Sequence, residues 1–344
     1  MFLISKKWNM AFFTILHLIV DGLCSLVIFQ KLYTNDYQQC LIVFLCYNFL
    51  AFLSQPFVGL FIDKKNHPKV FLFISMLFLL LGVCSAQIVV LSAILLGIGN
   101  SFFHISGGKY VIEKSHNDIS LLGVFVSTGV IGLTLGQHYA SKALWIIFLI
   151  FLVIFTLLII LSKEKDTNVS IHIEEQETIK KREKKLILVL LIFIVMIRSF
   201  VGKILILDFS KTSFVFLLLA IFTALGKALG GIFVKWLKMK KTILFSMILA
   251  IFCFMFPSNI YLTLIGIAAF NFTMPITLWY ANELYRKNEG LAFGLLAASL
   301  IPGYLLGMLE YTTPIVYFLV IFLSSLSLIF ILLIDRKNTY VEYH

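Results

Sequence analysis

Residues 40–69 read CLIVFLCYNFLAFLSQPFVGLFIDKKNHPK, and this stretch decides the class of fold. None of the residues before Asp63 is charged, and this apolar run is long enough to cross the roughly 30 Å hydrocarbon core of a bilayer as a helix. The run ends at Asp63, Lys64 and Lys65, where a spanning helix would leave the bilayer. The stretch therefore predicts a membrane-spanning helix followed by a short charged loop.

The same pattern recurs along the whole chain. Its 344 residues are 60% hydrophobic and 13% charged, with a mean hydropathy of +1.01, whereas soluble proteins are about 45–50% apolar and about 25% charged. Twelve helices of about 20 residues each would use about 240 residues, which leaves no room for a folded soluble domain. We therefore expect an all-α membrane protein with spans at 9–30, 40–62, 70–88, 90–110, 119–138, 143–162, 186–206, 213–235, 242–257, 260–282, 290–308 and 314–334.

Basic residues set the expected orientation. The formal net charge is +11, but most Lys and Arg residues lie in short segments between apolar runs, where they act as topology signals and do not form a nucleic-acid surface. With both termini in the cytoplasm, the basic residues placed outside are Lys31, Lys142, Lys203 and Lys211. We expect a multi-pass protein of the plasma (inner) membrane, a monomer surrounded by lipid, with no nucleic-acid partner.

The cysteines and motifs exclude several functions. The five cysteines lie mostly within apolar runs and form no CxxC pair and no His/Cys cluster, so the sequence indicates neither a disulfide framework nor a zinc site. It contains no Rossmann, P-loop or Walker pattern, which argues against transport driven by ATP. No reactive constellation typical of an enzyme is present. We expect no cofactor, no metal and no enzymatic activity.

A weak internal repeat divides the chain. Three glycines of the fifth expected span recur 171 residues later, where Gly123, Gly132 and Gly136 match Gly294, Gly303 and Gly307. An offset of about half the chain predicts two parallel repeats of six spans each. The polar segment between them carries acids followed by bases, as a solvated tether would. The expected units are residues 1–162, a cytoplasmic linker at 163–185, and residues 186–344.

The stretch from Gln55 to Lys69 resembles the loop signature of the major facilitator superfamily, in which a Gly is followed four residues later by an Asp and then by a basic cluster. Glycine permits close helix approach, and a carboxylate at a helix end pairs with bases. The resemblance implies an inner gate built from Gly59, Asp63, Lys64, Lys65 and Lys69. In the second half, Gly231 matches Gly59 but Lys235 stands in the place of Asp63, so we expect no equivalent gate there.

A second stretch narrows the resemblance. Residues 99–108, GNSFFHISGG, look like the GNxxFHxxGG segment of a poorly characterised bacterial branch of this superfamily, which is similar to the fosmidomycin-resistance-type exporters. The fifth span lacks the Gly-Pro pair typical of drug/proton antiporters. The resemblance implies the major facilitator fold, with about twelve helices in two pseudo-symmetric halves. It also implies secondary transport by alternating access, with protons as a partner.

Polar residues inside the expected spans are the candidate site, because such residues are costly in lipid and usually face a cavity. In the superfamily, spans one, four, seven and ten line the central cavity. The candidates on these spans are His17 and Asp21, Asn100 and His104, Arg198, and Asn271. Gln55 and Lys227 are weaker candidates, and Lys227 could instead extend its ammonium group to the membrane surface.

The chemistry of these residues suggests roles. A buried carboxylate such as Asp21 can carry a proton, and His17 and His104 can relay one. Arg198 keeps its charge, so it would hold an anionic substrate or act as counter-ion to Asp21. A membrane histidine can also serve only as a hydrogen-bond partner between helices. We expect a transporter of a small anionic or polar solute. The alternatives are an exporter of amphipathic compounds and, from other classes, a membrane sensor or a membrane enzyme.

Overall fold

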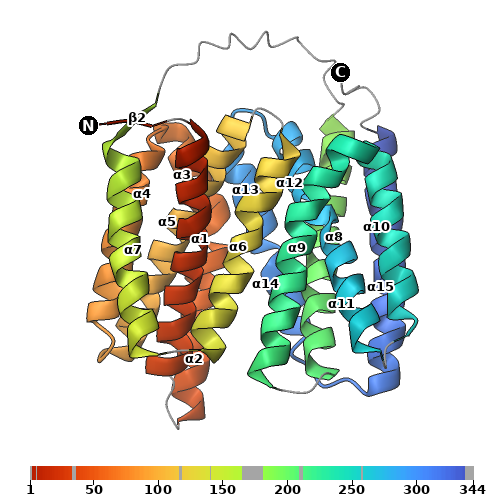
Figure 1. Cartoon of the computed structure of the whole chain (residues 1–344), viewed down its shortest axis with the longest axis horizontal. Coiled ribbons are helices and arrows are strands. Elements are labelled where there is room, and N and C mark those ends of the chain that lie inside the picture. The colour runs from red at the N-terminus through yellow and green to blue at the C-terminus, as the bar shows by residue number, and fades with distance from the viewer. Residues whose placement is uncertain are drawn as a thin grey trace.

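The computed structural model is a bundle of helices that run side by side (Figure 1). It describes residues 2–4, 6–32, 36–115, 118–139, 141–164, 181–208, 212–256 and 259–337. The first half contains β1 (Phe2–Ile4), α1 (Lys6–Leu26), the π-helical η1 (Val27–Lys31), α2 (Tyr37–Asn48), the π-helical η2 (Phe49–Leu53), α3 (Gln55–Lys65), α4 (Pro68–Cys84), α5 (Val89–Ser115), α6 (Ile119–His138), α7 (Lys142–Leu161) and β2 (Ser162–Glu164). The second contains α8 (Lys181–Asp208), α9 (Ser213–Leu237), α10 (Met239–Phe254), α11 (Ile260–Asn271), α12 (Thr273–Leu284), α13 (Glu289–Ala298), α14 (Leu300–Leu306) and α15 (Thr313–Lys337).

These helices account for the twelve expected spans. The first span is α1 with η1, the second is α2, η2 and α3 in succession, the tenth is α11 with α12, and the eleventh is α13 with α14. Among the described residues, ten helical stretches are long and apolar enough to cross a membrane. The third and ninth spans are shorter, because α4 has 17 residues and α10 has 16. The predicted helical membrane fold is confirmed.

Four spans consist of more than one helical element, and in three of them a proline lies close after the change. Pro56 lies at the start of α3 after η2, Pro275 at the start of α12, and Pro302 in α14. Proline lacks a backbone N–H and its ring collides with the carbonyl four residues earlier, so a helix bends or breaks there. Breaks of this kind reposition the polar side chains that follow them.

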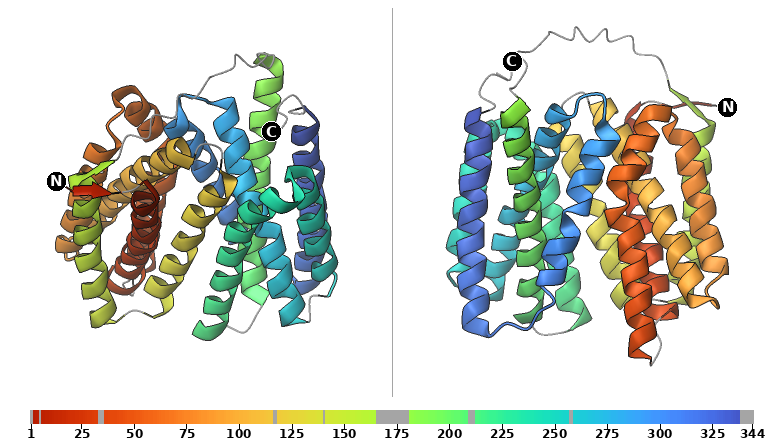
Figure 2. Two further views of the ribbon diagram at one scale, coloured as in Figure 1. Left: turned by 45° about the horizontal axis from the view of Figure 1, so that its top comes forward. Right: turned by 180° about the vertical axis from the view of Figure 1, so that it is seen from behind.

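Figure 2 shows the helices of the two halves side by side. The glycines of the internal repeat pack in matching ways in these halves. Gly132 on α6 lies against the backbone of Leu18 on α1, and Gly303 on α14 lies against the backbone of Met196 on α8. A methyl group at either glycine would overlap a carbonyl oxygen. The repeat therefore reflects the same close helix packing made twice, which small residues allow in membranes.

Both described ends of the chain lie at one end of the bundle, at the top of Figure 1. There β1 pairs in parallel with β2, Phe2 opposite Ser162, and α15 ends at Lys337. We call this the terminal end, and the other the far end. Residues 165–180 of the expected linker lie outside the described residues.

Candidate functional site

Four of the candidate polar residues of the first half meet between α1 and α5. His17 Nε2 lies 3.1 Å from His104 Nε2 and 3.3 Å from Asp21 Oδ2. His104 Nε2 lies 3.5 Å from Asp21 Oδ1, and the Asn100 amide donates to the same oxygen at 3.3 Å. His17, Asn100 and His104 are buried, and the Asp21 side chain is 15% exposed. We call these four residues the acid–histidine cluster.

The orientations of the two histidine rings are fixed by hydrogen bonds at their Nδ1 atoms. His17 Nδ1 lies 2.8 Å from the carbonyl oxygen of Phe125 on α6, and His104 Nδ1 lies 3.0 Å from the carbonyl oxygen of Asn100. Gly129, one turn further along α6, brings that helix against the cluster, because a Cβ there would meet Asp21 Oδ2 and His17 Nε2. Helix packing therefore turns both Nε2 atoms toward the Asp21 carboxylate.

Arg198 is the buried cation of the second half. Its guanidinium donates to Thr273 Oγ1 at 2.9 Å and to Thr277 Oγ1 at 3.4 Å, both on α12. Its Nε has no hydrogen-bond partner in the described part of the chain. Within those same residues, no ion pair joins Arg198 to Asp21, so the expected counter-ion contact is not made here. Neither threonine was a candidate, since no sequence signal links α8 to α12.

The remaining candidates differ in what they contact. Lys227 on α9 is half-buried, and it interacts electrostatically with both Asp21 and Arg198. Gln55 donates to the carbonyl oxygen of Ala51, while its side-chain oxygen is buried without a partner among the described residues. Asn271 donates to Ile267 of its own helix at 2.9 Å, which satisfies its amide locally. Lys227, a weaker candidate from the sequence, therefore interacts with two of the main candidate residues.

At the terminal end, Asp63 joins the two halves. Its carboxylate accepts from the backbone N–H groups of Gly290 at 3.0 Å and Leu291 at 2.9 Å, at the start of α13. Lys109 Nζ lies 3.0 Å from Asp63 Oδ1 and 3.2 Å from Glu289 Oε2. A carboxylate at a helix N-terminus also gains from the helix dipole. These contacts are buried, because the Asp63 and Lys109 side chains are only 2% and 3% exposed.

The basic residues of the loop signature have other roles. Lys64 and Lys65 are exposed, and Lys69 donates to the carbonyl oxygen of Ser162 at 2.7 Å, near β2. The base that Asp63 pairs with is Lys109, which was not among the candidate residues. Its spacing of four residues from Glu113, with which it pairs at 2.7 Å, was the only local signal.

The second copy of the signature also contacts the other half, although the equivalent gate role was not expected of it. Gly231 packs against the backbone of Ile119 as Gly59 packs against that of Gly290. Lys235 Nζ then lies 2.8 Å from Asp118 Oδ2. Asp118 itself caps α6 by accepting from the backbone N–H of Ser120. The reversal of charge at position 235 is thus matched by an acid on the opposite half.

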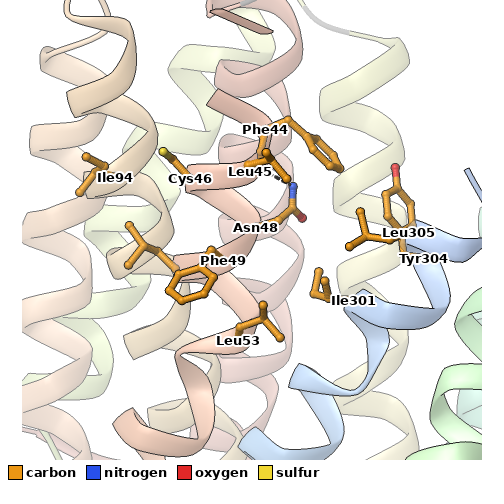
Figure 3. Close-up of a pocket in the computed structure, with 11 residues that line it drawn as sticks. Phe44, Leu45, Cys46, Asn48, Phe49, Leu53, Ile94, Ile301, Tyr304 and Leu305 are labelled. Carbon is orange, nitrogen blue, oxygen red and sulfur yellow. Dashed lines mark hydrogen bonds between the residues drawn. The ribbon is translucent and has the colours of Figure 1, made fainter. Parts of the chain in front are cut away.

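Aromatic contacts close the far end. His138 at the end of α6 stacks on Phe216 of α9 with ring centroids 4.2 Å apart, and Phe44 of α2 stacks on Tyr304 of α14 at 6.0 Å. Beside the second pair lies an apolar pocket of about 560 Å³ (Figure 3). Residues of α2 and η2, among them Asn48 and Phe49, face Ile301 of α14 across it. The aromatic pairs named here join the halves at the far end, whereas the ion pairs between the halves described above lie at the terminal end.

Two six-span halves, with polar side chains buried between them and contacts between them at both ends, define a membrane transporter. The sequence matches the family model of the Major Facilitator Superfamily over residues 10–308. The chain belongs to this superfamily.

The fold is similar to that of solved transporters. One is the Major Facilitator Superfamily transporter FucP in the outward conformation, with a TM-score of 0.68, 11% identity, and coverage of 96% of this chain and 99% of that one. Another is a variant of the E. coli fucose:proton symporter FucP, with a TM-score of 0.69, 12% identity, and coverage of 99% and 100%. No curated protein matches the sequence. The family and the fold are those of transporters, not of enzymes.

Proposed function

We propose that this protein transports a small anionic or polar organic solute by alternating access, in exchange or in symport with protons. It would act as a monomer in the plasma membrane, with both termini and the linker in the cytoplasm. The terminal end would be the cytoplasmic one, because Lys64, Lys65 and the other bases of the inner loops lie there. We also propose that the chain belongs to the bacterial branch of the superfamily that is similar to the fosmidomycin-resistance-type exporters.

One observation carries the proposal: the two halves contribute opposite charges to the space between them. The first half supplies Asp21 with two histidines, and the second supplies Arg198 and Lys227. Arg198 has a free Nε, and Lys227 has no ion-pair partner among the described residues. A buried guanidinium and a half-buried ammonium that no acid pairs with at ion-pair distance among the described residues are costly in a membrane. An anionic group on the solute would compensate them.

The proposal of proton coupling rests on the acid–histidine cluster of the first half. Asp21 can be neutralised in place by a proton shared with His17 or His104, since both rings lie within 3.5 Å of its carboxylate. A carrier whose first half binds a proton and whose second half binds an anion has states that both ligands bias. The fucose:proton symporter supports the idea that this fold can couple a solute to protons.

The test uses purified protein in liposomes. A thermal-shift screen against anionic metabolites first identifies a solute, because specific binding stabilises the folded state. An imposed pH gradient should then drive accumulation of that solute, and a proton ionophore should abolish it. Accumulation of the same extent with and without the pH gradient would contradict proton coupling. Binding of neutral compounds alone would contradict the proposal of an anionic solute.

Orientation has its own test. In a background without native cysteines, an impermeant thiol reagent added outside cells should modify Asn35→Cys and Tyr139→Cys. It should leave Asn168→Cys unmodified until the cells are opened. Labelling of the Asn168 variant in intact cells would overturn the proposed orientation.

The apolar pocket favours a second candidate function, the export of amphipathic compounds. The pocket lies between the two halves and is lined almost wholly by apolar side chains (Figure 3). If this candidate were right, Ile301→Trp should reduce transport by filling the pocket, whereas Arg198→Ala should have little effect. The proposal above expects the reverse.

A further inference from the structure

The acid–histidine cluster contains acceptors that face one another. Each Nδ1 lies against a backbone carbonyl oxygen, of Phe125 for His17 and of Asn100 for His104. A carbonyl oxygen can only accept, so each Nδ1 carries the ring hydrogen. In the neutral imidazoles both Nε2 atoms then carry lone pairs, and these lie 3.1 Å apart beside the carboxylate of Asp21. Such an arrangement repels itself unless a cation lies among the acceptors.

The distances suit a metal ion. A tetrahedral ion with bonds of about 2.0–2.1 Å to nitrogen and oxygen separates its ligand atoms by about 3.3–3.4 Å. The Nε2 atoms lie 3.1 Å apart, His17 Nε2 lies 3.3 Å from Asp21 Oδ2, and His104 Nε2 lies 3.5 Å from the other carboxylate oxygen, Oδ1. These three residues form a group of possible metal ligands. One ligand atom from each of the three residues lies within 4.8 Å of the others, so a small rotation of the carboxylate or of a ring would bring them around one ion.

We propose that His17, Asp21 and His104 bind a divalent first-row transition-metal ion of the zinc class between α1 and α5 in the first half of the transporter. Two imidazoles and one carboxylate are a ligand set that such ions prefer. Histidines that bind metals usually donate their other N–H to a carbonyl or carboxylate, as both do here. All three residues were candidates for the transport site, but a metal site was not expected, because His17 and His104 are 87 residues apart and show no metal-binding spacing.

The surroundings of the cluster offer one more possible ligand atom. Asn100 is buried, and its side-chain oxygen has no hydrogen-bond partner among the described residues, although its amide holds Asp21. Gly129 contributes no side chain where a Cβ would meet two of the ligand atoms. Three protein ligands leave a fourth position open for water or solute. Lys227 and Arg198, the nearest cations of the other half, do not reach the carboxylate within ion-pair distance.

The experiment uses metal-stripped full-length protein in detergent, with Zn²⁺ followed by calorimetry and Co²⁺ by its visible absorption. We expect one ion per chain and the intense absorption of tetrahedral Co²⁺. His17→Gln and His104→Gln should each weaken binding at least tenfold, whereas His67→Gln, which alters an exposed histidine, should not. Lowering the pH from 8 to 6 should weaken binding, because protons compete for the same lone pairs.

Gly129→Ala provides a variant that keeps all three ligands. Its methyl group should displace the ligand atoms and weaken Zn²⁺ binding at least tenfold while the variant retains its elution volume and helical content. The proposal is overturned if the wild-type protein shows no saturable binding of either ion, or if His17→Gln and His104→Gln bind as the wild type does. A shared proton would then be the cation of the cluster. Solute accumulation in the presence of a chelator separates the outcomes, since it tests transport without the ion.

Discussion

Lys235 Nζ lies 2.8 Å from Asp118 Oδ2, and this pair occupies the position in the second repeat that Asp63 and the start of α13 occupy in the first. The two contacts differ in burial. The side chains of Lys235 and Asp118 are 53% and 29% exposed, whereas that of Asp63 is 2% exposed and is held by Lys109. The same end of the molecule is therefore closed by one buried contact and one exposed contact.

Burial predicts that Asp63 matters much more than Lys235 for closure of the terminal end. Removing one partner of a buried pair costs about 3–5 kcal/mol, while an exposed pair contributes about 0–1 kcal/mol after screening by solvent. Asp63→Asn should thus shift the population toward the state open at this end by two orders of magnitude or more, and Lys235→Ala by a few-fold at most. Spin-label distances between α3 and α13 would measure both shifts. Lys64→Ala, an exposed lysine beside Asp63, is the control, and an equal response to the Asp63 and Lys235 substitutions would contradict the prediction.

The exposed pair should not respond to physiological pH. Burial by itself raises the pKa of Asp118, but hydrogen bonds from Lys235 and Ser120 outweigh it and leave the pKa below its ordinary value of 3.8. A lowered carboxyl pKa stabilises the closed contact above pH 3.8, and this stabilisation is lost only as the pH falls toward the lowered value. The distance between α6 and α9 at the terminal end should therefore be unchanged from pH 8 to pH 5. An increase of this distance between pH 8 and pH 5 that is absent in the Asp118→Asn variant would show that the pKa of Asp118 is raised and not lowered.

Two glycines of α6 should respond to the same substitution in different ways. A Cβ at Gly129 would meet the movable side-chain ends of His17 and Asp21, so Gly129→Ala should fold normally and lose transport by more than tenfold. A Cβ at Gly132 would meet the backbone of Leu18, which cannot move without separating α1 from α6. Overpacking of this kind costs about 1–3 kcal/mol, so Gly132→Ala should lower thermal stability. Thermal unfolding and transport of both variants test the contrast, and equal losses of stability would refute it.

The fold was predictable because its signals are local. Each apolar run is bounded by charges within its own stretch of sequence, as Asp63 and Lys64 bound the second span. The partial repeat was readable because Gly132 and Gly303 meet the same packing demand in each half. His17 and Asp21 could be placed together because four residues bring side chains onto one helical face.

The rest depends on how separate helices meet. Asp63 pairs with Lys109 on α5 and with the backbone of α13, more than 200 residues away in the case of Gly290. Arg198 was expected near Asp21, but Thr273 and Thr277 of α12 hold its guanidinium. Side chains that project from different helices find partners according to helix tilt and rotation, and neither is encoded in the residues flanking them.

The coupling role of Asp21 and the binding role of Arg198 should separate in transport assays. Asp21→Asn keeps the size of the side chain, but an amide has no negative charge and cannot take up or release a proton. It should therefore abolish accumulation against a gradient while exchange of solute across the membrane continues, because exchange needs no net proton movement. Arg198→Ala should instead weaken binding of an anionic solute at least tenfold in both assays, since it removes a cation whose Nε is unpaired among the described residues.

Arg198→Lys distinguishes charge from geometry in the same position. Lysine restores the charge but cannot donate to Thr273 and to the solute with a fixed planar group, so it should recover only part of the lost affinity. Counterflow of radiolabelled solute in liposomes, with and without a pH gradient, measures both roles in one preparation. His67→Gln, which alters an exposed histidine, is the control and should leave the ratio of accumulation to exchange unchanged. If Asp21→Asn still accumulates solute, or if Arg198→Ala binds it as tightly as the wild type, the division of roles between the two halves is wrong.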